Sequence, residues 1–380
     1  MAMDFPAIER LRSSDPLKSD LARPDKVAAF RHDRVEGAEW DRMVADFDGI
    51  CQEQLHVFSR ARWPGVVIDP LVFRRNQRPA GGCIVMYRRL PARLGGLAVA
   101  KWGPIMADAS ALDPGAEYEA MVEALIERYA VDMGLMLSVL PRAVPAERNS
   151  QFEHLRERGF RDGAGLPFPN RYFVRIEQDD AAQRASFAQK WRYHLNKSEQ
   201  AGLIFERYPA SALPVFQSLY DAMMDRKRFP DYSAVHTLPA LMGTQISGIR
   251  PQLFLVSHDG APVAGAIIFV AGNTAVYLYG ATNDRALPLN AGFFMHHRII
   301  GWLRENSRAS WYDLGGTDGF EGLHRFKSGM VGKTGVVSQV PAPMYYANRA
   351  WPRMLGTAVY RARDLRTRVR QAIQRKRANG

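Results

Sequence analysis

The sequence predicts an α/β (α+β) protein with two structurally similar domains, each built on a mixed, largely antiparallel sheet, plus a basic C-terminal helix. Three observations support this prediction. The chain has 380 residues, which is more than one hydrophobic core usually organises. Short β-rich runs punctuated by Pro and Gly alternate with helical patterns. Both halves also repeat one order of elements, an antiparallel meander followed by a helix and a further strand.

In the first half, apolar residues at helical spacing predict a helix over residues 37–59. β-rich runs separated by turn residues then predict an antiparallel meander, with strands over 65–69, 82–88 and 97–102. The pattern after the meander predicts a helix over 114–133, a strand over 134–140, a helix over 151–158 and a strand over 171–176. Helices that interleave with strands in this way indicate packing around a sheet rather than a helical bundle.

The second half repeats this plan. It begins with a basic helix over 187–202, a strand over 203–208 and helices over 213–228 and 238–245. A second meander has strands over 252–257, 263–270 and 274–279, and a helix over 289–305 and a strand over 311–314 follow it. A polar loop at 178–183 is the expected junction. We therefore expect a first domain over 1–180, completed by 334–350, a second domain over 181–333 and a tail over 351–380.

Composition excludes several classes of protein. A hydrophobic fraction of 47% and a mean hydropathy of −0.26 exclude a largely disordered chain and a multi-span membrane protein. Two cysteines, Cys51 and Cys83, are too few for a disulfide framework and lie in no zinc-ligand pattern, which favours a reducing compartment. The N-terminus reaches charged residues before any apolar run, so we expect no secretory signal and a cytoplasmic protein.

The net charge of +12 is concentrated at the C-terminus. Residues 351–380 hold nine basic side chains against one acidic residue, Asp364. Apolar residues recur there at three- and four-residue steps, which predicts a helix with a narrow apolar stripe and a broad arginine face. Such a helix suits a membrane surface or a phosphate-bearing partner, and it equally suits ordinary docking on the body of the protein.

Several segments together resemble the FemABX-like proteins, which are tandem GNAT-fold N-acyltransferases best known for attaching amino acids to peptidoglycan precursors. The segments are 263–268, Tyr-Leu-Tyr-Gly within 276–281, Tyr-Asp-Leu-Gly-Gly over 312–316, Gly-Leu-His-Arg-Phe-Lys-Ser-Gly over 322–329, Trp-Gly-Pro over 102–104 and the basic helix over 191–202. The resemblance covers about residues 60–345 and implies two GNAT-like domains. The sequence departs from well-known peptidoglycan members because 213–252 is too short for their coiled-coil arm.

The resemblance implies catalytic roles for Lys327 and Phe326. Amide formation requires stabilisation of the oxyanion that develops on the attacked carbonyl, and Lys327, expected in a glycine-flanked turn, would supply the cation. A surface lysine in a loop is the alternative. Phe326 would stack on a base of the donor, or else serve as a core anchor.

Five further residues are candidates for substrate binding. Tyr277 and Tyr279 are expected on one face of a strand. They would either line a substrate groove or pack as ordinary structural residues. Arg226 resembles an arginine that binds acceptor phosphates in the family, although a solvated helix-end arginine fits as well. Asp108 and Asp313 are candidate carboxylates, and Asp318 is a third. Each could orient a proton, cap a helix or form an ion pair.

The prediction of the acyl donor depends on a motif that the sequence lacks. Residues 285–292 do not reproduce the pyrophosphate loop with which many GNAT enzymes hold coenzyme A. Aminoacyl-tRNA is therefore favoured over acyl-CoA as donor, and it suits the basic charge. We expect an amine of a cell-envelope precursor as acceptor, a possible peripheral contact with the inner membrane face, and no metal or cofactor. The alternatives are an acyl-CoA enzyme acting on a lipid or polysaccharide amine and a non-catalytic adaptor that binds membrane or nucleic acid.

Overall fold

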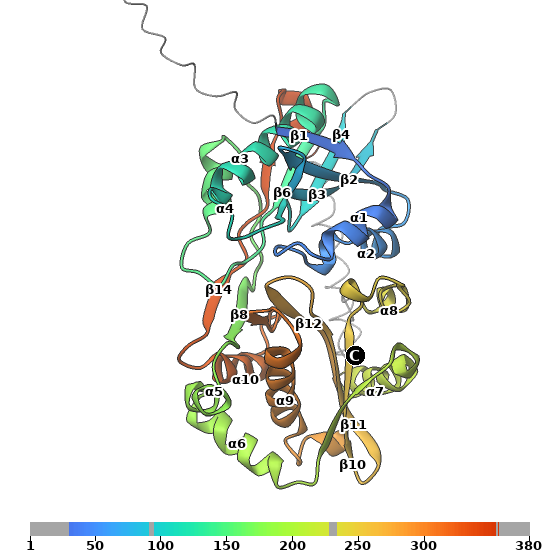
Figure 1. Ribbon diagram of the computed structural model, residues 1–380, viewed down its shortest axis with the longest axis vertical. Helices are drawn as coiled ribbons and strands as arrows, with labels where there is room; N and C mark the ends of the chain where they lie inside the picture. The colour runs from blue at the N-terminus through green and yellow to red at the C-terminus, as the bar shows by residue number, and fades with distance from the viewer. Residues whose placement is uncertain (1–29, 91–94, 228–233, 355, 357–380) are drawn as a thin grey trace, which may run out of the picture.

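Two units lie one above the other along the long axis of the computed structural model (Figure 1). The structure describes residues 30–90, 95–227, 234–354 and 356. Each unit contains one sheet with helices packed on it. Helices α1, α2 and α8 lie at the waist where the units meet (Figure 1).

The first unit contains the sheet with strand order β1-β2-β3-β4-β6-β15-β7, and β5 pairs separately with β3. Its strands are β1 (Phe30–Arg34), β2 (Val67–Arg75), β3 (Arg78–Arg89), β4 (Gly96–Lys101), β5 (Ile105–Met106), β6 (Met136–Leu140), β7 (Arg161–Asp162) and β15 (Met344–Tyr346). Its helices are α1 (Gly37–Val44), the single turn η1 (Gln52–Gln54), α2 (His56–Arg62), α3 (Pro114–Leu125), continued as a π-helical turn over Ile126–Asp132, and α4 (Ser150–Glu157).

The second unit contains the sheet with strand order β14-β8-β13-β12-β11-β10-β9. Its strands are β8 (Asn170–Arg175), β9 (Ile204–Tyr208), β10 (Gln252–His258), β11 (Ala261–Phe269), β12 (Thr274–Thr282), β13 (Trp311–Asp313) and β14 (Val336–Gln339). Its helices are α5 (Asp180–Ser186), α6 (Gln189–Glu199), α7 (Leu213–Lys227), α8 (Leu238–Met242), α9 (Ala291–Asn306) and α10 (Glu321–Val331), with short turns η5 (Val235–Thr237) and η7 (Asp284–Ala286) among the connections.

The two sheets share one topology. In each, four antiparallel strands end in a strand that pairs in parallel with the next one, β4 with β6 and β12 with β13. Two antiparallel strands complete each sheet, β15 and β7 in the first unit and β8 and β14 in the second. The duplication expected from the order of elements is therefore present in the strand order itself.

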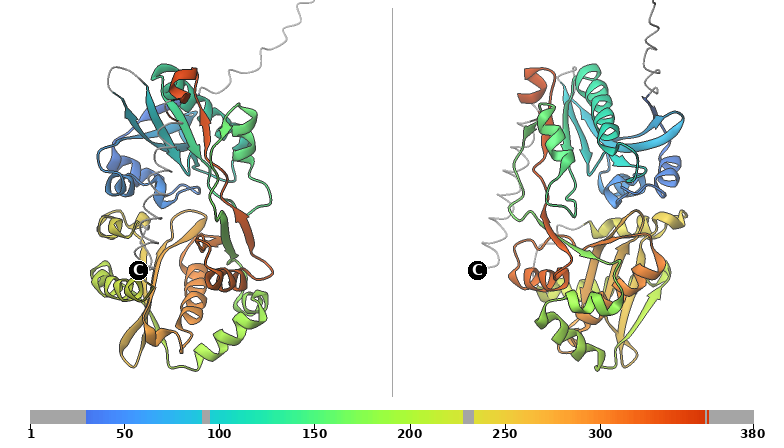
Figure 2. Two further views of the ribbon diagram at one scale, coloured as in Figure 1. Left: turned by 180° about the vertical axis from the view of Figure 1, so that it is seen from behind. Right: turned by 60° about the vertical axis from the view of Figure 1, so that its left-hand side comes forward.

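The strand pairing departs from the expected boundaries. β8 precedes the junction expected at residue 180, yet it pairs with β13 and β14 of the second unit. The range 334–350 is divided, because β14 joins the second sheet and β15 the first. Figure 2 shows the chain after α10 running from the second unit back to the first. The local pattern predicted β8 but neither β14 nor β15, and it held no information about strand partners.

The helix expected over 37–59 is interrupted. α1 ends at Val44 and α2 begins at His56. Between them Gly49 donates a backbone hydrogen bond to Met106, and a Cβ at Gly49 would lie 2.9 Å from the Met106 nitrogen. The chain must leave the helix to make this close backbone approach, which the apolar spacing does not reveal.

The core of the waist is shared by both units. Trp40 and Ile50 of the first unit cluster with Leu241 and Phe269 of the second, and all four are fully buried. A core that crosses the waist fixes the position of one unit on the other. Within the described ranges, no helix combines the length and hydropathy needed to cross a membrane. The predicted tail helix over 351–380 lies outside the described residues except for its first positions.

Candidate functional site

The second sheet opens between β12 and β13. These parallel strands pair over only three residues each, Thr274–Val276 with Trp311–Asp313, while β12 continues to Thr282. In the first unit, β4 stays paired with β6 to its last residue. Within the described ranges no strand pairs with this side of β12 after Val276. An unpaired strand edge can hydrogen-bond an extended ligand. Among the described residues, the central parallel pair parts in the second unit and not in the first.

A β-bulge lies at the start of the opening and corrects one prediction. Ile267 pairs with Tyr279 but the next residue, Ile268, pairs with Tyr277, so Leu278 is an extra residue on β12. Cross-strand partners share a face, which places Tyr277 and Tyr279 on opposite faces rather than on one. Tyr277 packs with the core beneath α9, and Tyr279 packs with the core beneath α7. Strict alternation failed because the bulge inserts one residue.

Tyr277 lies against a buried histidine. Its ring is 4.8 Å from that of His296 on α9, and the His296 Nδ1 is 3.1 Å from the hydroxyl of Tyr312. Burial, together with the positive charge of Lys327, lowers the pKa of His296 to about 3. The imidazole is therefore neutral near pH 7 and can accept or donate a hydrogen bond without carrying charge. Sequence reasoning treated His296 as structural and missed its place beside the lysine.

Lys327 is buried, with 8% of its surface exposed, on helix α10. The segment expected as a glycine-flanked turn is thus helical. Its ammonium donates to the carbonyl oxygens of Leu314 at 2.6 Å and Gly316 at 2.5 Å. Both acceptors lie in the loop that follows β13, at the opening of the sheet. α10 therefore fixes a positive charge beside the opening, where low polarity strengthens its effect.

Phe326 belongs to an aromatic cluster. Its ring centroid lies 4.9 Å from Phe293, 5.5 Å from His296 and 6.2 Å from Trp191. It is half-buried and packs against the core of the second unit. The contacts favour the core-anchor interpretation, because the ring supports the helix turn that carries Lys327.

Asp313 is fully buried at the end of β13 and forms ion pairs. It accepts from Arg171 Nε at 2.7 Å and from the backbone nitrogen of Gly315 at 2.9 Å. Arg142 Nη2 lies 3.8 Å from the same carboxylate. Asp313 thus holds the start of the loop whose carbonyls bind Lys327. The contacts fit the ion-pair alternative rather than a freely acting base.

Arg226 and Tyr279 lie on the α7 side of the sheet. Arg226 donates to Asp284 at 2.8 Å and to Thr282 at 3.2 Å, which ties the end of α7 to the end of β12. Burial raises the pKa of Tyr279, and the Glu53 carboxylate, which comes from the first unit, raises it further. Tyr279 therefore lies within electrostatic range of the first unit.

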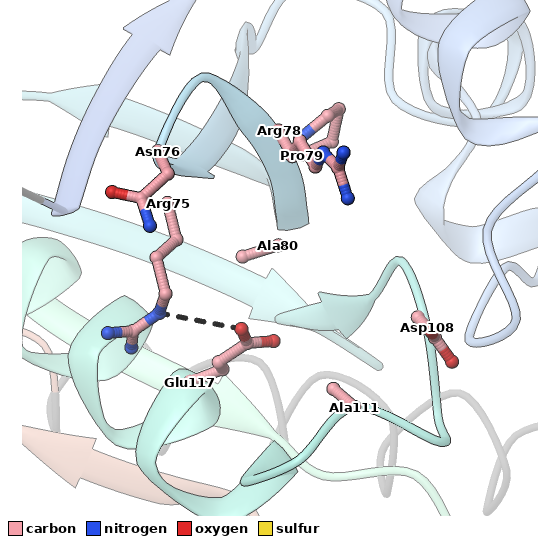
Figure 3. A pocket seen from close by; sticks show the side chains of 8 residues that line it. All are labelled: Arg75, Asn76, Arg78, Pro79, Ala80, Asp108, Ala111 and Glu117. Carbon is pink, nitrogen blue, oxygen red and sulfur yellow. Dashed lines mark ion pairs between the residues drawn. The ribbon is translucent and has the colours of Figure 1, made fainter. Parts of the chain in front are cut away.

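Asp108 lies in the first unit, away from these groups. It accepts from the backbone nitrogen and the hydroxyl of Ser110, both at 2.7 Å, and these hydrogen bonds lower its pKa. Figure 3 shows it at the edge of a pocket of about 500 Å³, across from the Arg75–Glu117 ion pair. Asp318 is exposed in a left-handed turn with φ of 50°. No contact described in the structure joins either carboxylate to Lys327.

Comparison with known proteins agrees with this architecture. Residues 172–328 match the family model described as an acetyltransferase (GNAT) domain. The solved structure of FemX aligns with a TM-score of 0.69 at 17% identity, covering 83% of this chain and 97% of that one. The chain has a FemABX-like tandem GNAT fold.

Two further solved structures align with this chain at lower similarity. L-PGS from Bacillus licheniformis aligns with a TM-score of 0.51 at 12% identity, covering 84% of this chain and 95% of that one. A conserved protein of unknown function from Bacteroides thetaiotaomicron aligns with a TM-score of 0.56 at 11% identity, covering 83% and 99%. A search of the curated proteins found no match. The match to the acetyltransferase (GNAT) domain model lies within the second unit, which contains the opening and Lys327.

Proposed function

We propose that this protein is an N-acyltransferase that moves an aminoacyl group from aminoacyl-tRNA to an amine of a cell-envelope precursor. The acceptor nitrogen bonds to the carbonyl carbon, the ester bond to the ribose oxygen breaks, and the proton lost by the amine passes to that oxygen. The product is an amide. The observation that carries this proposal is the buried ammonium of Lys327, held by the Leu314 and Gly316 carbonyls at the only sheet opening in the described parts of the chain.

Each part of the site would have its own role in this reaction. The free edge of β12 would bind the extended end of the donor through backbone hydrogen bonds. The positive charge of Lys327 would stabilise the oxyanion that forms on the attacked carbonyl, which is the charge that develops in the transition state. Tyr277 and neutral His296 would border the acyl group, and Tyr279 and Arg226 would face the acceptor. The reaction would take place in the cytoplasm or at the inner face of the membrane.

The alternative donor is acyl-CoA, since the matching family model is described as an acetyltransferase. Incubating the purified protein with charged tRNA or with acyl-CoA, an amine acceptor and mass-spectrometric detection of the amide would separate the donors. Amide formed only from acyl-CoA would replace the aminoacyl proposal with this alternative.

Replacing Lys327 tests the catalytic assignment. We expect Lys327→Met to lower kcat by about a hundredfold or more, because removing one oxyanion-stabilising group typically has this effect. Methionine keeps most of the side-chain volume, and circular dichroism would confirm the fold. Lys333→Ala, an exposed lysine just beyond the same helix, is the matched control and should retain full activity. Unchanged turnover by a folded Lys327→Met protein would refute the role.

A further inference from the structure

A single indole ring at the junction between the units is surrounded by three cations. Trp102 follows β4, and its ring centroid lies 4.6 Å from the guanidinium of Arg171, 5.8 Å from that of Arg142 and 5.6 Å from the ammonium of Lys101. The three cations come from three different elements. Lys101 is the last residue of β4, Arg142 lies in the loop that follows β6, and Arg171 belongs to β8. Their convergence is therefore a product of the tertiary fold. We call Trp102 and these three residues the Trp102 cluster.

The carboxylates at the Trp102 cluster do not balance its charge. Lys101 pairs with Glu53 at 2.8 Å, and Arg171 pairs with Asp313 at 2.7 Å. Arg142 approaches Asp313 only to 3.8 Å, without a hydrogen bond between them. Two carboxylates among three cations leave one positive charge, and Arg142 is the cation without a carboxylate of its own.

The position of Arg142 is energetically unfavourable because two of its donors have no acceptor in the part of the chain that the structure describes. Its Nε and Nη2 atoms are buried and have no hydrogen-bond acceptor among the described residues. A buried donor without an acceptor is unfavourable by about 1–3 kcal/mol, more when it is charged, so such a group in a folded protein indicates a missing partner. Trp102 itself has a φ of 58°, a left-handed conformation that bulky residues rarely adopt and that also concentrates at functional sites.

The Trp102 cluster adjoins the acyl-transfer site through one loop. Asp313, which binds Arg171, accepts from Gly315, and the carbonyls on either side of Gly315 bind Lys327. The side chains of Arg142 and Arg171 are 13% and 12% exposed, so solvent reaches part of each, although the Nε and Nη2 atoms of Arg142 are themselves buried. A ligand anchored here would therefore lie near the carbonyl that Lys327 is proposed to stabilise.

We propose that the Trp102 cluster is a phosphate-binding subsite, with Arg142 as its principal anchor. Two guanidinium groups present planar pairs of donors that match a phosphate. We assign the phosphate to the acceptor, because Lys101, Trp102 and Arg142 belong to the first unit whereas the opening for the donor lies in the second. This assignment to the acceptor rests on the proposed function, but phosphate binding itself does not.

Calorimetric titration with inorganic pyrophosphate tests the subsite without turnover. We expect Arg142→Gln to weaken binding by about tenfold or more, since a charge-assisted bidentate contact is lost. Arg142→Lys keeps the positive charge but loses the paired donors of the guanidinium. Its affinity for pyrophosphate should lie between those of the wild type and Arg142→Gln. Arg148→Gln, an exposed arginine in the same loop, is the matched control and should bind as the wild type does. Melting curves identify the folded variants.

Two outcomes would overturn the subsite. One is no binding of pyrophosphate by the wild type, and the other is equal affinity in folded Arg142→Gln, which would leave Arg142 as a structural clamp on Asp313. Steady-state kinetics then locate the phosphate: a raised KM for the acceptor supports the assignment, and a raised KM for the donor alone refutes it. If no acyl transfer is found but Arg142→Gln loses pyrophosphate binding, the subsite stands and the proposed function fails.

Discussion

Individual residues at the candidate site depend on close contacts that only particular side chains allow. Tyr277 lies over Gly280, three positions along β12, so that a Cβ at Gly280 would lie 1.5 Å from the Tyr277 hydroxyl. The glycine in the Tyr-Leu-Tyr-Gly segment therefore leaves space for the tyrosine that packs on His296. The sequence identified the segment, but not that its glycine and first tyrosine contact one another.

Gly280→Ala tests this contact. We expect the new methyl group to displace the Tyr277 ring and to lower the free energy of unfolding by about 1–3 kcal/mol, as overpacking usually does. Chemical denaturation would measure the change. Gly301→Ala is the matched control, because the Cβ position at this α9 glycine is open and alanine favours a helix by about 1 kcal/mol. Equal stability of Gly280→Ala and the wild type would contradict the contact.

At the scale of elements, α1 and α2 are joined by one buried carboxylate. Asp41 on α1 accepts from the backbone nitrogens of His56 at 2.6 Å and Val57 at 2.9 Å, the first residues of α2. Burial raises the pKa of Asp41 to about 6, although the two hydrogen bonds oppose the shift. The carboxylate thus caps a helix while it is kept from water.

This carboxylate gives stability a definite dependence on pH. The folded state holds the Asp41 proton more tightly than the unfolded state, so its contribution to stability falls as pH rises from about 4 to 6, by roughly 1.4 kcal/mol per unit of pKa shift. Asp41→Asn cannot ionise, and its melting temperature should rise relative to that of the wild type over this range.

Melting curves at several pH values would measure this difference. Asp46→Asn, an exposed residue two positions beyond α1, is the control and should show no such trend. A constant difference between Asp41→Asn and the wild type from pH 4 to 7 would show that burial does not raise the pKa.

For the whole molecule, the waist core makes the two units one cooperative structure. Phe269 at the end of β11 packs in the same cluster as Trp40 and Ile50 of the first unit. Strand β15 further connects the units, since it completes the first sheet but follows the whole of the second sheet in the chain. Independent unfolding of the units would break both connections.

Phe269→Ala tests this cooperativity. We expect the wild type to unfold in one calorimetric transition and Phe269→Ala to keep a single transition with a free energy of unfolding lowered by about 3–5 kcal/mol, the usual cost of a phenylalanine cavity. Scanning calorimetry would measure both. Two separate transitions, with only one displaced by the substitution, would show that the units fold independently.

Local pattern determined much of this protein. Most strands, most helices, the duplicated plan and the segment containing Lys327 were predictable, because strand and helix periodicities and turn residues act over a few neighbouring positions. The family resemblance placed Lys327 correctly within the second unit, although its segment is helical rather than a turn.

Only the tertiary structure decided how these pieces meet. The bulge that separates Tyr277 from Tyr279, the ion pairs that bury Asp313, and the cations around Trp102 each depend on partners far away in the sequence. The boundary between the units likewise depends on β8 pairing in the second sheet and β15 pairing in the first. Periodicity specifies which side chains share a face within one helix or strand. The packing of elements that are distant in the sequence specifies which residues those side chains contact.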